Sequence, residues 1–139
     1  MELNKIHLYG SDKEDFEVLS SLMQDAAIPT SEMKFDKVDK KFFLVCSRFS
    51  WESKLQNKGN KRIVSGICFN NVIEAKKKNF PSLHSENILN FLTLKQMSGF
   101  VELIFSNNIL IKLEGNNISF RIDDLNKEWP TIFSPNQKK

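Results

Sequence analysis

The chain has 139 residues, of which 40% are hydrophobic and 27% are charged, and its formal net charge is +3 at pH 7. This length suits one domain with one core, and no apolar run approaches the roughly 18 residues that a membrane-spanning helix needs, so we expect a soluble protein without a membrane span. Residues 1–5 lack the apolar segment of a secretory signal and both cysteines lie in predicted strands, which favours a cytoplasmic protein with free thiols.

The first part of the chain predicts one strand, one amphipathic helix and a hairpin. Alternation indicates a strand over residues 4–9, and a helix is expected over about residues 12–27 with Ser11 and Glu14 in capping-box spacing. Pro29 then ends the helical pattern. A strand around Phe35, a polar turn at residues 36–40 and a returning strand from Lys41 to Phe49 should follow, and the last of these is apolar on both faces, as in a central strand.

The middle of the chain predicts three further strands. Residues 61–70 and 72–78 alternate, and the second run ends in three lysines that belong on an exposed edge or loop. Residues 87–95 favour a strand, with a buried helix as the alternative.

Residues 100–122 have the most regular alternation in the sequence. A three-residue loop at residues 106–108 would place Val101, Leu103 and Phe105 opposite Leu113, Ile111 and Ile109. A Gly115-Asn116 turn would then set this second strand against a third that carries Ile118, Phe120 and Ile122. The nine apolar side chains would share one buried face.

These elements predict an α+β fold for residues 1–130, followed by a tail at residues 131–139. Its mainly antiparallel sheet would be curved or partly closed into a barrel, with a pleckstrin-homology-like barrel as one form. One N-terminal amphipathic helix and one short C-terminal helix would complete it. The C-terminal helix is expected after Asp123-Asp124, before Pro130.

Three segments support a family resemblance. They are the Gln24-Asp25-Ala26 helix end, the Arg48-Phe49-x-Trp51-Glu52 segment and the run from Val101-Glu102-Leu103 to Asp123-Asp124-Leu125. On these the chain resembles an alphaproteobacterial domain-of-unknown-function family of small single-domain proteins, over nearly its whole length. The resemblance implies no catalytic residues.

The end of the predicted central strand carries the most distinctive polar cluster. Arg48, Trp51 and Glu52 lie where this strand meets an aperiodic segment, and Arg and Trp are typical of interface hot spots. The cluster could bind a protein, a peptide or an anionic ligand. The alternative is a structural role in which Trp51 is buried and Arg48 pairs with an acid.

The segment from residue 54 to residue 78 is basic, with seven basic residues against the single acid Glu74. Its first part contributes Lys54, Lys58, Lys61 and Arg62 as candidate contacts for nucleic acid or another polyanion. The alternative is a solvated surface, because the overall net charge is small.

The residue types needed for catalysis are scarce. His7 and His84 are the only histidines, so a histidine metal cluster is excluded, and Cys46 in an apolar strand suits a core residue better than a nucleophile paired with His84. We expect no cofactor and no metal. The sequence therefore predicts a non-catalytic binding or assembly module, with a polyanion binder, an enzyme with an unrecognised site and a homodimer as alternatives.

Overall fold

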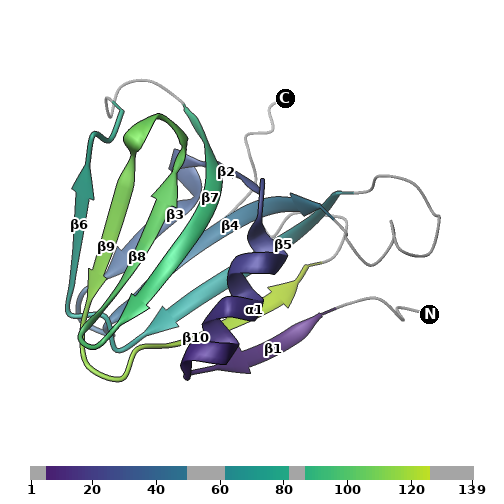
Figure 1. Ribbon diagram of the computed structural model, residues 1–139. Coiled ribbons are helices and arrows are strands. Elements are labelled where there is room, and N and C mark those ends of the chain that lie inside the picture. Colours follow the sequence, from purple (N-terminus) through teal and green to yellow (C-terminus); the bar gives the residue numbers. More distant parts are fainter. Residues whose placement is uncertain (1–5, 50–61, 82–86, 126–139) are drawn as a thin grey trace.

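The computed structural model describes residues 6–49, 62–81 and 87–125 (Figure 1). Within them the chain forms one α-helix, α1 (Lys13–Met23), and two 3-10 turns, η1 (Thr30–Glu32) and η2 (Ser106–Asn108). The same residues form ten strands: β1 (His7–Gly10), β2 (Ala27–Pro29), β3 (Met33–Asp36), β4 (Lys41–Phe49), β5 (Arg62–Asn70), β6 (Glu74–Lys78), β7 (Ile88–Met97), β8 (Phe100–Phe105), β9 (Leu110–Glu114) and β10 (Ser119–Asp124). None of the helices within these ranges is long and apolar enough to cross a bilayer.

The strands form one antiparallel sheet in the order β1-β10-β5-β4-β2-β7-β8-β9-β6, with β3 also paired to β4. The three-residue strand β2 joins two halves of the sheet, which bend toward each other (Figure 1). The sheet stays open, with β1 and β6 as its outer strands.

The predicted α+β fold with a partly closed barrel and two helices is therefore wrong, although the predicted antiparallel pairing is correct. The predicted barrel does not form because β9 pairs with β6 on its outer side, whereas β10 pairs with β1 and β5. The order of strands therefore ends at β1 and β6 and does not close on itself. The C-terminal helix fails at its start, because Asp123 and Asp124 continue β10 as strand residues. Residues 126–130 lie outside the described residues. The chain is mainly β, with one helix in its described part.

The N-cap of helix α1 lies one residue later than predicted. Asp12 is the N-cap: its side chain accepts from Asp15 N (2.8 Å), and the Asp15 carboxylate accepts from Asp12 N (3.3 Å). This reciprocal pair replaces the predicted Ser11–Glu14 box because aspartate also satisfies the free N–H groups of a first turn. The helix ends at Met23, before its predicted end at about Ala27, and Ala27 is the first residue of β2.

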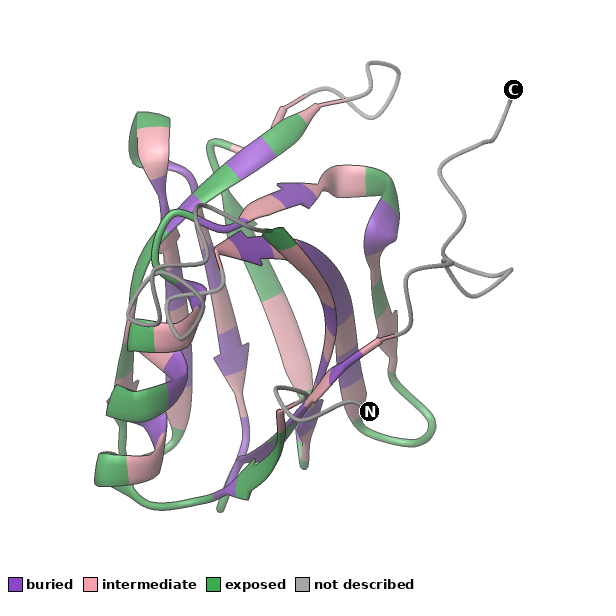
Figure 2. Cartoon of the chain, turned by 90° about the vertical axis from the view of Figure 1, so that its right-hand side faces the viewer, coloured by how far each residue is buried: buried purple, intermediate pink, exposed green. Residues whose placement is uncertain are grey.

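The core lies between the two halves of the sheet and α1. The buried residues of both halves and of the helix form one hydrophobic cluster, and Figure 2 marks buried positions along both halves and along the helix. Helix α1 contributes Phe16, Leu19 and Met23, and the Phe16 ring meets Phe120 of β10 edge-on at 4.9 Å. The helix thus covers the opening between β7 and β1 (Figure 1).

The β8–β9 hairpin has the predicted register. Val101 lies opposite Leu113, and Leu103 lies opposite Ile111, across the 106–108 loop. The predicted third strand is wrong in its partner, because β10 lies in the other half of the sheet. All nine apolar side chains are nevertheless buried, since the two halves face each other: Val101, Leu103, Phe105, Ile109, Ile111, Leu113, Ile118, Phe120 and Ile122.

Two more predictions of this region are confirmed. Residues 88–97 form a strand and not a helix. The three consecutive lysines, residues 76–78, are exposed on β6, the outer strand of the sheet. Lysine on an outer strand discourages pairing with another chain.

Candidate functional site

The predicted cluster at the end of β4 is described only in part. Arg48 and Arg62 lie on the paired strands β4 and β5, where Arg48 is opposite Ile63 and Arg62 is opposite Phe49. Arg48 therefore shares a face of the sheet with Ile63, and Arg62, the residue before Ile63, points to the other face. The two guanidinium groups thus lie on opposite faces of the sheet. The other predicted site residues lie outside the described residues: Trp51, Glu52, Lys54, Lys58 and Lys61.

Arg48 is fully buried in a polar network on the core face of the sheet. Its Nη2 donates to Asp124 Oδ2 at 2.9 Å and to Oδ1 at 3.1 Å, and its Nε donates to Ser65 Oγ at 3.0 Å. Ser65 Oγ in turn donates to Asp124 Oδ1 at 2.6 Å. The backbone N–H of Ile6 completes the shell of the carboxylate at 2.9 Å. Arg48 is thus engaged in joining β4, β5 and β10.

Arg62 is exposed and packs against its own strand pair. Its guanidinium carbon lies 4.2 Å from the centre of the Phe49 ring, and its Nη1 donates to the backbone oxygen of Ser47. These contacts tie the Arg62 side chain to β4 while leaving part of its surface accessible.

The structure places the other candidate chemical groups in structural roles. Burial raises the pKa of the Cys46 thiol to about 12, so this thiol is protonated at neutral pH and lacks the thiolate that a nucleophile requires. His84, the base considered as its partner, lies outside the described residues. Asp123 contacts His7 and Arg121, each at 2.8 Å, and no group of metal-ligating side chains occurs among the residues that the structure describes.

Glu32 is the one buried side chain in the described ranges with an unpartnered polar atom, Oε1. Burial raises its carboxyl pKa. It lines neither of the two hollows described next, so it supplies no site there.

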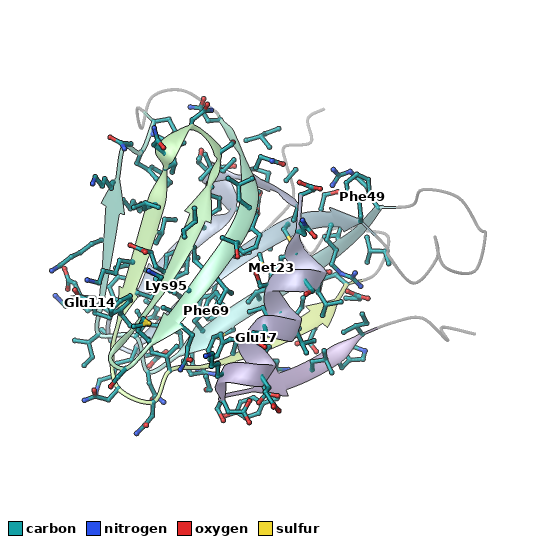
Figure 3. The ribbon with its side chains drawn as sticks, viewed as in Figure 1. Glu17, Met23, Phe49, Phe69, Lys95 and Glu114 are labelled. Atoms are coloured by element: carbon teal, nitrogen blue, oxygen red, sulfur yellow. The ribbon has the colours of Figure 1, made fainter. Side chains whose placement is uncertain are left out.

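A groove between α1 and β7 is the larger of these two hollows, with a volume of about 480 Å³. Leu94 and Met97 contribute apolar surface to it, whereas Glu17 of α1 and Lys95 of β7 bring charge to its two sides (Figure 3). At one position the groove is bridged by Ser20, whose Oγ lies 3.1 Å from Thr93 Oγ1 and accepts from Leu94 N at 3.4 Å.

A second hollow, of about 380 Å³, continues from this groove, since Gln96 and Met97 line both. It is bounded by two turns, residues 98–100 and 115–117, and by Ser11 before the helix. Together the two hollows offer apolar surface, hydroxyl groups and backbone groups. That combination suits noncovalent binding.

No sequence prediction located the groove. Its two sides are far apart in the chain, since the Ser20–Thr93 contact spans 73 positions. Neither side carries a motif by itself, so only the folded topology brings them together.

The comparisons with known proteins name the family and no activity. Neither the curated proteins nor the solved structures gave a match. A family model matches residues 6–137, which is nearly the whole chain and agrees with the resemblance found in the sequence. The chain belongs to the family described as "Protein of unknown function (DUF2948)".

Proposed function

We propose that this chain is a non-catalytic binding module whose ligand occupies the groove between α1 and β7. The observation that carries the proposal is the groove itself: its volume of about 480 Å³ falls in the range of roughly 300–1,000 Å³ that is usual for ligand sites. Its mixture of apolar, hydroxyl and charged groups is also typical of such sites.

The chemistry of the described residues supports binding over catalysis. The buried Cys46 thiol is protonated at neutral pH, because burial raises its pKa. Arg48 and Asp124 are hydrogen-bonded to each other in the network that joins the strands. The groove has Lys13, Glu17 and Lys95 as its charged groups, and they stand on an exposed surface where water screens them. Such groups orient a ligand more readily than they transfer its protons.

A fragment screen by two-dimensional NMR of the ¹⁵N-labelled protein tests the proposal. We expect fragments with one aromatic ring and one polar group to shift the amide signals of Ser20, Thr93 and Met97 together, because these residues line one hollow. Ser21→Trp should abolish the shifts by filling the groove from the exposed side of α1. Val18→Trp, on an exposed helix position outside the lining, is the matched control.

The proposal fails if no fragment shifts these signals. It also fails if Ser21→Trp binds the fragments as well as Val18→Trp does, because the ligand would then lie elsewhere.

A further inference from the structure

The edge of β7 that faces β2 changes its partners along the strand. Over Ile88–Asn90 it pairs with β2, and Phe91 continues the pairing: its N–H donates to Ala26 O at 2.9 Å and its oxygen accepts from Asp25 N at 3.0 Å. The register against β8 then shifts between Phe91 and Thr93. Beyond this bulge, the described part of the chain places no strand along the same edge of β7.

The backbone groups of this second part point into the groove. Leu94 N–H donates to Ser20 Oγ of α1, which shows that it is directed away from β8. Alternate residues of a strand direct their backbone groups to the same side, so the N–H and C=O of Gln96 face the groove as well. At Leu94 the Ser20 side chain thus takes the place that a neighbouring strand would have. At Gln96 that place belongs to the groove.

Helix α1 covers this edge without filling the space beside it. The serine bridge closes the groove at Thr93 and Leu94, whereas at Gln96 and Met97 the groove borders the second hollow of about 380 Å³. The outer strand β6 is different, because Lys76, Lys77 and Lys78 stand along it and discourage added strands. The Thr93–Met97 edge carries one lysine, Lys95, which lies opposite Glu102 of β8.

We propose that the groove binds an extended peptide that adds a short strand to the edge of β7 over Lys95–Met97, beyond the position that Ser20 occupies. This inference rests on the proposed binding function and names its ligand class. The peptide backbone would pair with the N–H and C=O of Gln96, and peptides recognised in this mode gain affinity from main-chain hydrogen bonds and specificity from alternate side chains. The side chains directed at Leu94 and Met97 would be apolar, because those residues supply the accessible apolar surface of the groove.

The probe is a peptide selected from a random dodecapeptide phage library on the full chain, with its Kd measured by fluorescence anisotropy. Gln96→Pro removes the N–H that faces the groove and keeps every hydrogen bond to β8, since proline is tolerated where the strand N–H faces away from the ladder. We expect it to weaken binding by about tenfold or more. Gln96→Ala keeps the N–H and is the control, with a Kd within about threefold of the unchanged protein.

A second measurement leaves the protein unchanged. Derivatives of the selected peptide are methylated at one backbone nitrogen at a time, which removes one donor each. Pairing with β7 at Gln96 predicts that affinity falls when the one peptide nitrogen opposite Gln96 is methylated and stays nearly constant when either neighbouring nitrogen is methylated. This result decides the question even if Gln96→Pro does not fold.

Four outcomes overturn the proposal. The first is that no peptide is selected, and the second is that Gln96→Pro binds the peptide as Gln96→Ala does. The third is that methylation has a uniform effect along the peptide. The fourth is a dimer in size-exclusion chromatography that dissociates in Gln96→Pro, because a second copy would then occupy the edge. If fragments bind the groove and no peptide does, the peptide class is wrong while the proposed function stands.

Discussion

Asp124 is the residue on which the packing of three strands converges. Its carboxylate accepts hydrogen bonds from Arg48 of β4, from Ser65 of β5 and from the backbone of Ile6 before β1. Both side chains of the ion pair are almost inaccessible, at 0% and 1% relative exposure. Burying two charges is costly, so the pair stabilises the fold only while both partners and their hydrogen bonds are present.

We predict that Asp124→Ala lowers the free energy of unfolding by about 3–5 kcal/mol, because it leaves the Arg48 charge buried without its carboxylate. Urea denaturation followed by circular dichroism measures the change. The double variant Arg48→Met, Asp124→Leu should lose less than the single variant, since it removes both charges together.

The neighbouring Asp123 provides the control. It pairs with Arg121 at 2.8 Å, but the Arg121 side chain is 65% exposed. Asp123→Ala should therefore cost less than about 1 kcal/mol. Equal losses from Asp123→Ala and Asp124→Ala would show that the buried network has no special role.

At the scale of elements, β9 alternates strictly between buried and half-buried side chains, as its partner β8 does. Ile111 is fully buried and lies opposite Leu103, whereas Lys112 is half-buried on the other face, opposite Glu102, with its Nζ 4.4 Å from the centre of the Phe100 ring. The two neighbouring residues thus meet opposite environments within one strand.

We predict that Ile111→Asp unfolds the protein, because it places a charge without a partner in the core and costs several kcal/mol, comparable to the whole stability of a small domain. Lys112→Asp should leave the chain folded, with a loss of about 1 kcal/mol from like charges beside Glu102. Circular dichroism and thermal melting distinguish them. Equal damage from both substitutions would contradict the register.

The elements that could be predicted from the sequence are those fixed by local contacts. The β8–β9 hairpin follows from alternation on both sides of a short loop, and β4 follows from apolar residues on both faces. Strand β2 has only three residues and depends on pairing with β4 and β7, so alternation could not reveal it. The helix boundary was missed because Ser11 and Asp12 both suit an N-cap.

At the scale of the whole molecule, the order of the strands depends on contacts that local patterns do not encode. The β9–β10 connection passes close to the β5–β6 connection: a Cβ on Gly115 would lie 2.0 Å from the backbone oxygen of Asn71, so only glycine fits there. After this close approach, β10 pairs with β5 and β1 in the other half of the sheet. The groove between α1 and β7 also depends on contacts between distant parts of the chain, so no local sequence motif predicted it.

The described basic residues of the 54–78 segment lie on two different parts of the fold. Substituting them tests the alternative that the ligand is a polyanion. Lys76, Lys77 and Lys78 are exposed on β6, although Lys76 lies 3.3 Å from Glu114 and Lys77 lies over the Phe80 ring at 4.6 Å. Arg62 belongs to the first part of the basic segment and is held against Phe49. The two parts can therefore be substituted separately.

If Lys54, Lys58, Lys61 and Arg62 contact a polyanion, changing all four to Gln should abolish retention on heparin and binding to single-stranded DNA, with little change in Tm. Three or four phosphate contacts would weaken binding by roughly 30-fold to 100-fold between 50 and 200 mM salt. The control changes Lys76, Lys77 and Lys78 to Gln and should retain binding. Loss of binding in the control alone would move the contacts to β6, and no retention of the unchanged protein at low salt would mean that the basic segment is a solvated surface.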